Sequence, residues 1–179
     1  KAIGFVGLSG KTEFPHLHFQ VSKGKQIIDP FIGVKRSEKC RAGEETLWDE
    51  TTKAMLSYQN LVIYNGGFND QRPLADGIHR GLYKKSTLFK SSLKLFLWFA
   101  IRNTKQDDEV VLRLLGPDGK EIGVAKNTIK KAQARGIQIL DVTSQGAWPV
   151  GNYRGEITLT RKGLIGDQTF RARRRITIK

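Results

Sequence analysis

Cysteine, histidine and long apolar runs are scarce in this sequence. The 179 residues include one cysteine, Cys40, and three histidines. One cysteine cannot form a disulfide within the chain, so Cys40 is either a free thiol or the partner of a cysteine elsewhere, and no neighbouring His or Cys indicates a zinc site around it. The most apolar run, residues 93–101, contains Lys94 and is far shorter than the roughly 18 residues of a membrane span. No membrane-spanning helix is therefore predicted.

Acidic residues are also few. Seventeen Asp and Glu stand against 31 Lys and Arg, which gives a formal net charge of +14. The excess is spread along the chain, because residues 1–36 already carry six basic and two acidic side chains. A basic surface favours a polyanion such as nucleic acid, anionic lipid or a carboxylate-rich wall polymer. A basic protein without such a partner is the alternative.

Short alternating segments separated by Gly and Pro indicate strands and turns rather than long helices. LKLFLWFAIR, residues 93–102, is apolar on both strand faces, as a central strand is. EVVLRLLGPDGKEIG, residues 109–123, predicts a hairpin with a Pro-Asp-Gly turn. IQILDVT and two further strands follow at a spacing of about 10–15 residues, which favours a mainly β fold with an antiparallel sandwich.

Three segments separate along the chain: residues 1–36, a connector at 37–79, and a sandwich at 80–179. The connector has no clear period, although Leu47–Trp48 and Met55–Leu56 are candidates to anchor it through a helical turn. LVIYNGGF, residues 61–68, predicts a strand that runs into a Gly-Gly turn. Trp48, Trp98 and Trp148 are expected to be packing residues rather than a sugar-binding platform.

The last strand, TFRARRRITIK, separates its side chains into two faces. Phe170, Ala172, Ile176 and Ile178 share one face with Arg174, whereas Arg171, Arg173, Arg175 and Lys179 share the other. The second face could bind phosphate groups of lipid or nucleic acid. A solvated strand face is the more common meaning of this pattern, and no aromatic-interleaved nucleic-acid motif accompanies it, so no nucleic-acid partner is predicted.

Two of the three histidines lie two residues apart near the start of the chain. Ile3–Val6 and Pro15–Val21 are predicted strands, so His16, His18 and Gln20 share one face, while Leu17, Phe19 and Val21 are expected to be buried. Imidazoles about 7 Å apart on a strand can both reach one metal, or one can bind it while the other contacts its water. The alternative is a pair of half-exposed histidines at a sheet edge.

The order of these elements resembles a known family. IGFVGLSGKTEFPHLHFQVSKGKQIIDP, residues 3–30, closely resembles the C-terminal end of the lysostaphin-type (LytM-like) zinc metallopeptidase domain, with a Gly-x-x-Gly loop at Gly7 and Gly10, then Pro-His-Leu-His-Phe from Pro15, then Asp-Pro at Asp29. Phe14 and Gln20 depart from the usual Gly and Glu. Residues 1–36 are thus expected to be a C-terminal fragment of such a domain.

The resemblance also implies the roles of the two histidines. His18 is similar to a zinc ligand of this motif, and His16 to the catalytic histidine that orients or deprotonates the zinc-bound water or stabilises the oxyanion. The family's other two ligands, a His and an Asp, would precede Lys1, because His79 lies in DGIHRGLYKK without a suitably spaced acid and is interpreted as a turn or surface residue. The chain would then be the back part of a longer enzyme, favoured here, or the remnant of a disabled one.

The remaining residues resemble, less sharply, the β-rich extension of proteobacterial enzymes of this type, which makes 80–179 an immunoglobulin-like accessory domain. The resemblance implies a Zn2+-dependent endopeptidase that cleaves amide bonds in peptidoglycan, in the periplasm or cell envelope. The alternative is a catalytically inactive binding or regulatory protein whose basic sandwich docks a polyanion or a partner hydrolase. The cleaved bond and the oligomeric state stay open.

Overall fold

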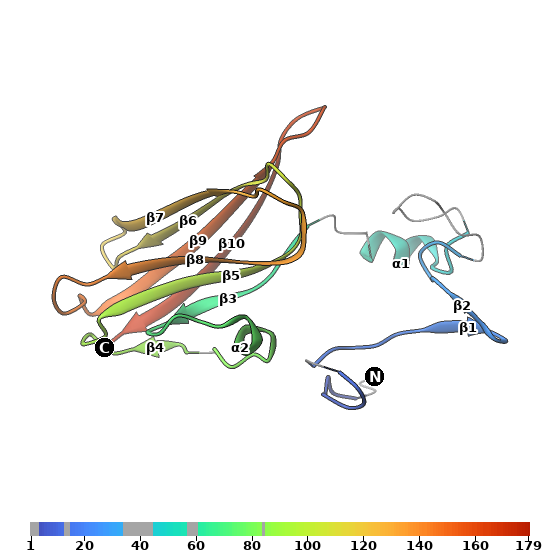
Figure 1. Cartoon of the computed structure of the whole chain (residues 1–179), viewed down its shortest axis with the longest axis horizontal. Coiled ribbons are helices and arrows are strands. Elements are labelled where there is room, and N and C mark those ends of the chain that lie inside the picture. The colour runs from blue at the N-terminus through green and yellow to red at the C-terminus, as the bar shows by residue number, and fades with distance from the viewer. Residues whose placement is uncertain (1–3, 13–14, 34–44, 57–60, 84) are drawn as a thin grey trace. The chain divides into compact units, whose positions relative to one another are not determined.

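The computed structural model describes residues 4–12, 15–33, 45–56, 61–83 and 85–179, so Cys40 lies outside the described residues. The fold is mainly β, which confirms the predicted fold class. The chain divides into two compact units, Lys1–Asn60 and Leu61–Lys179 (Figure 1).

The first unit has little regular structure. A hairpin of β1 (Val21–Lys23) and β2 (Gln26–Ile28) turns at Gly24, whose φ of +61° favours glycine. A short helix, α1 (Glu50–Met55), begins where the Asp49 side chain accepts a hydrogen bond from the Thr52 amide, a standard N-cap. This is the helical turn expected in the connector.

Two strand predictions in this unit are wrong. Residues 4–6 and 15–20 are not strands, so the second strand begins only at Val21. Leu17 and Phe19 are 78% and 61% exposed instead of buried. The physical reason is that a strand buries one face only when a second layer covers it, and no strand pairs with residues 15–20 among those the structure describes.

The second unit contains two sheets. The larger has the order β4-β10-β9-β6-β7 and the smaller has the order β3-β5-β8 (Figure 1). Their elements in chain order, with the intervening helix, are β3 (Val62–Asn69), α2 (Ala75–His79), β4 (Thr87–Leu88), β5 (Lys94–Thr104), β6 (Glu109–Leu115), β7 (Glu121–Thr128), β8 (Gln133–Thr143), β9 (Gly151–Arg161) and β10 (Gln168–Ile178). All pairings are antiparallel except that of β4 with β10. The predicted hairpin at Pro117–Gly119 is confirmed as β6–β7.

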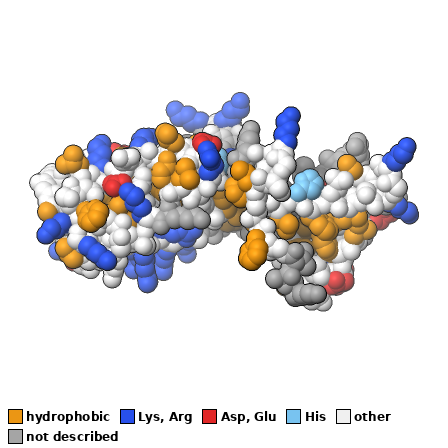
Figure 2. All heavy atoms as spheres, turned by 90° about the horizontal axis from the view of Figure 1, so that it is seen from below, with side chains coloured by type: hydrophobic (Ala, Val, Ile, Leu, Met, Phe, Trp, Pro, Cys, Tyr) orange, Lys and Arg blue, Asp and Glu red, His pale blue; other side chains and the backbone are white. Residues whose placement is uncertain are grey.

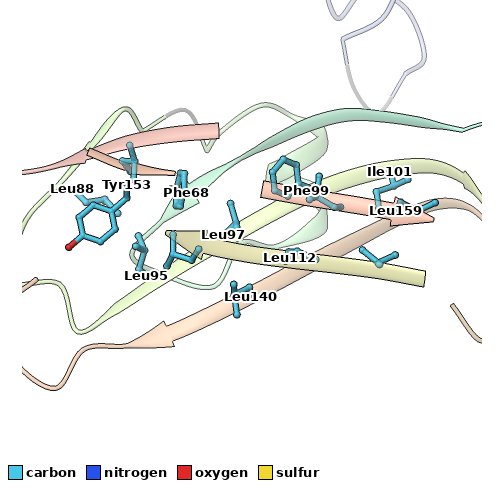
Figure 3. Packing of buried hydrophobic residues seen from close by; sticks show 14 of the residues in the cluster. Phe68, Leu88, Leu95, Leu97, Phe99, Ile101, Leu112, Leu140, Tyr153 and Leu159 are labelled. Atoms are coloured by element: carbon cyan, nitrogen blue, oxygen red, sulfur yellow. The ribbon is translucent and has the colours of Figure 1, made fainter. Parts of the chain in front are cut away.

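Both sheets contribute to one hydrophobic core. Leu97 and Phe99 from β5 meet Leu112 from β6 and Leu159 from β9, and all four are at most 2% exposed (Figure 3). Arg174 of β10 lies on the same side and donates from Nε to the carbonyl of Gly66 in β3, 2.9 Å away, which joins the sheets at one edge. The immunoglobulin-like assignment itself stays a prediction.

Strand β5 is central, as its two apolar faces predicted. It lies between β3 and β8, and its second face contributes Trp98 and Ala100 to a smaller core with Ile78 of α2. Trp98 is 1% exposed and packs edge-on against Tyr83, which confirms it as a packing residue. Residues 61–79, expected to form part of the connector, therefore pack with the strands that follow them.

The predicted Gly-Gly turn is wrong, because β3 continues through both glycines. A Cβ at Gly66 would lie 2.5 Å from the Phe99 ring, and one at Gly67 would lie 3.2 Å from the Trp98 ring. The glycines therefore permit close packing against β5 rather than a chain reversal. Trp148, 6% exposed, donates from Nε1 to the Ser92 carbonyl at 2.7 Å and is likewise a packing residue.

Candidate functional site

Both motif histidines are solvent-exposed in the segment that leads into β1. The Nδ1 atom of His16 lies 3.1 Å from the hydroxyl of Thr12, a hydrogen-bond contact that orients the ring. Thr12 follows Gly10, whose φ of +77° gives the loop a left-handed turn that favours glycine. Thr12 was not singled out from the sequence, although its position four residues before His16 and just after the glycine loop is a usable signal.

His18 opens onto a concavity of about 1120 Å³. The walls are formed by residues 17–20 and by residues 25–33, which include β2 and the turn after it. The lining combines the imidazole with apolar side chains such as Ile27 and Phe31, with the cationic Lys25 and with the anionic Asp29. An extended peptide would meet both apolar surface and one charge of each sign in this space.

The Asp29–Pro30 step leads into a turn. The Phe31 amide donates to the Asp29 carboxylate at 2.8 Å, and the Gly33 amide donates to the Asp29 carbonyl at 2.8 Å. The Asp29 side chain thus stabilises the turn itself, as an Asx-turn does. This turn fixes the far wall of the concavity relative to β2.

Trp48 supports the histidine segment from behind. Its ring stacks on Phe19 with centroids 5.8 Å apart and meets Phe31 edge-on at the same distance. Two hydrogen bonds attach the preceding residues to the turn, because the Leu47 amide and the Thr46 side-chain hydroxyl both donate to the Pro30 carbonyl. Trp48 is therefore an anchor of the former connector, as expected, whereas Met55 is 81% exposed.

The described part of the chain contains no group of three or more His, Cys, Asp and Glu side chains that could hold a metal ion. Imidazole nitrogen is a normal zinc ligand, and the exposed ring of His18 is accessible to a metal ion. The role assigned to His18 by the resemblance stays a prediction. His79 belongs to the other unit, where it ends α2 with Nδ1 3.4 Å from the Tyr64 hydroxyl.

A second candidate site is the arginine face, defined as the outward side chains Arg113, Arg154, Arg171, Arg173 and Arg175 of the larger sheet. Register places Arg171, Arg173 and Arg175 beside Thr158, Glu156 and Arg154 of β9. Glu156 accepts from both Arg154 and Arg173 at 3.0 and 3.1 Å, while Arg173 stays 71% exposed. In the single view of Figure 2, which labels no residue, Lys and Arg side chains are more prominent than Asp and Glu. The prediction that Arg174 alone points inward is confirmed.

Comparison with known proteins adds no relative: no family model matches the chain, and no curated protein matches it. In addition, no helix among the described residues is long and apolar enough to cross a bilayer.

Proposed function

We propose that this chain contributes to a zinc-dependent endopeptidase that hydrolyses amide bonds in peptidoglycan peptides of the cell envelope. The observation that carries the proposal is the ordered motif, with the glycine loop, His16, His18 and the Asp29–Pro30 turn at their expected spacing. The exposure of both imidazoles and the concavity beside His18 support it, because a substrate chain needs access to both rings.

In this proposal His18 would be one of the residues that hold the zinc ion, and the resemblance implies that a His and an Asp complete the ligand set. Zinc, when bound, polarises the scissile carbonyl and lowers the pKa of a coordinated water to about 7. His16 accepts a proton from the attacking water, and its contact with the Thr12 hydroxyl orients the ring for that transfer. Lys25 attracts the carboxylates of the peptide substrate.

The test uses the longest natural form of the protein and purified peptidoglycan. His16→Ala and His18→Ala should each lower the release of soluble fragments by at least about a hundredfold, as loss of a catalytic or metal-binding group does. Only His18→Ala should also reduce bound zinc, measured by atomic absorption. His79→Ala is the matched control, since it removes a histidine from the other unit. Full activity in both His16→Ala and His18→Ala would reject the proposal.

The arginine face favours one second candidate, a non-catalytic protein that docks a polyanion. Five arginines lie along one sheet surface, and only Glu109, Glu121 and Glu156 lie among them on neighbouring register positions. Binding to a polyanion such as heparin that weakens steeply with salt, and that falls in Arg171→Gln/Arg173→Gln, would favour this function if peptidoglycan is not cleaved.

A further inference from the structure

The hairpin between β9 and β10 ends in two exposed aliphatic side chains. Its tip, residues 162–167, projects beyond the neighbouring strands (Figure 1). Leu164 and Ile165 at the tip are 108% and 105% exposed, the highest values for aliphatic side chains among the described residues. Adjacent large aliphatic groups gain free energy when an apolar environment removes them from water. The tip therefore has the character of an insertion or docking element.

Basic side chains lie at the same end of the unit as this tip. Register aligns Glu109 with Thr128 and Thr160, which places the β5–β6 turn, the β7–β8 turn and the β9–β10 hairpin at one end of the unit. Arg102 and Arg135 are paired on β5 and β8 near the same end. We define the hairpin end as Leu164 and Ile165 with the six cations of these segments: Arg102, Lys105, Lys130, Lys131, Arg135 and Lys162.

Three exposed acids share the hairpin end: Asp107, Glu109 and Asp167. Glu109 accepts from Lys162 at 3.1 Å, and this hydrogen bond and the charge of Glu109 raise the pKa of Lys162, with smaller contributions from the charges of Asp167 and Asp107. The cations still outnumber the acids two to one. The local field is therefore positive around an apolar projection.

A buried ion pair fixes the three loops to one another. Arg161, at the base of the hairpin, donates from Nε and Nη2 to the two carboxylate oxygens of Asp108 at 2.8 and 2.7 Å, and from Nη2 to the Asn103 carbonyl at 2.8 Å. Asp108 is 1% exposed. Its carbonyl accepts from the Ile129 amide of the β7–β8 turn. Because these bonds hold the base, less conformational freedom is lost when the tip binds.

We propose that the hairpin end docks on an anionic phospholipid bilayer, with Leu164 and Ile165 entering the boundary between headgroups and acyl chains while the surrounding cations contact lipid phosphates. A bilayer supplies phosphate and hydrocarbon side by side, which matches the combination at this end. Nucleic acid supplies the phosphate but no cover for aliphatic side chains. The proposal concerns the second unit and holds whether or not the first unit belongs to a peptidase.

The test measures co-sedimentation of the full chain with vesicles of phosphatidylglycerol and phosphatidylethanolamine, and with vesicles of phosphatidylcholine alone. Wild type should bind the anionic vesicles and bind phosphatidylcholine much more weakly. Leu164→Ser/Ile165→Ser should weaken binding at least about tenfold, because it removes two buried aliphatic groups. Lys130→Gln/Lys131→Gln should lower the affinity for anionic vesicles by about fivefold for each lysine removed near the membrane surface.

Leu93→Ser is the matched control, since Leu93 is 81% exposed and lies before β5, at the opposite end of the unit. It should bind like wild type. The proposal is overturned if wild type fails to bind anionic vesicles, if the tip variant binds unchanged, or if Leu93→Ser loses as much affinity. It is also overturned if Arg171→Gln/Arg173→Gln abolishes binding while the tip variant does not, because the arginine face would then be the docking surface.

A second measurement separates insertion from surface adsorption. Lipids brominated on their acyl chains should quench the tryptophan fluorescence of the Leu164→Trp variant more strongly than that of wild type with the same vesicles. Equal quenching of variant and wild type would place the tip outside the hydrocarbon and contradict the proposal.

Discussion

The two units of this chain differ in how far they bury their apolar side chains. In the second unit, two sheets enclose a core in which Leu97 and Phe99 are fully buried. In the first, Phe5 is 103% and Leu17 is 78% exposed, and Ile28 is the one hydrophobic residue buried among those described there. Similar apolar content thus gives a core only where a second layer is present.

The difference bears on the proposed function. The second unit has the residues to fold around its own core, whereas the motif histidines lie on a segment backed mainly by the contact of Phe19 with Trp48. The rings of His16 and His18 are exposed and therefore accessible to a substrate, but the segment that carries them has little packing of its own among the described residues.

The most direct test of this difference in burial is to truncate one leucine in each unit of the 179-residue chain. Leu97→Ala should lower the free energy of unfolding of the second unit by about 2–5 kcal/mol, because it leaves a cavity in a closed core. Leu17→Ala should change the free energy of unfolding by less than about 0.5 kcal/mol, because Leu17 is exposed. Urea unfolding followed by Trp fluorescence measures both. An equal loss in both variants would mean that Leu17 is covered and that the two units do not differ as described.

Much of the second unit could be predicted from sequence, because its signals are local. Apolar and polar residues alternate along β9, and Tyr153, Ile157 and Leu159, which share one face of this strand, are all buried. The Pro-Asp-Gly turn and the doubly apolar β5 were likewise correct. In each case the pattern and the partner lie in the same chain, so burial follows from the pattern.

The features that the sequence did not predict depend on contacts with residues elsewhere in the chain, which the periodicity of a segment does not reveal. Alternation in residues 15–20 predicted a strand, but no described strand pairs with it. The Gly-Gly pair was interpreted as a turn because sequence carries no record of the Phe99 ring that approaches Gly66. The Thr12–His16 contact depends on a loop conformation set by Gly10.

Glycine substitutions test the same difference between the units with a smaller expected effect on stability. Gly66→Ala should destabilise the second unit by about 1–3 kcal/mol, because the new methyl group would overlap the Phe99 ring in a packed core. Gly7→Ala should leave the free energy of unfolding nearly unchanged, because no atom lies within 4 Å of its Cβ position and its φ is not positive. Thermal unfolding by circular dichroism measures both. A neutral Gly66→Ala would show that β3 can move away from β5.

The smallest expected difference concerns pH. A hydrogen bond from Lys85 at 2.7 Å lowers the pKa of Asp70 in the second unit, and the hydrogen bond from the Thr52 hydroxyl lowers the pKa of Asp49 in the first. A carboxyl with a lower pKa in the folded state stabilises that state above its unfolded pKa of about 3.9, and this contribution is lost as pH falls through the folded pKa. Carboxyl titration by NMR should therefore place both groups below about 3.9.

Only Asp70 should affect unfolding of the second unit. Asp70→Asn should lower its free energy of unfolding by about 0.2–1 kcal/mol at neutral pH, the range of a partly exposed ion pair, and the difference from wild type should vanish below the folded pKa of Asp70. Asp49→Asn should leave this unfolding unchanged at every pH, because the α1 cap belongs to the first unit. A pH-dependent effect of Asp49→Asn on the second unit would show that the two units unfold together. The chain would then have two compact units but one cooperative unfolding transition.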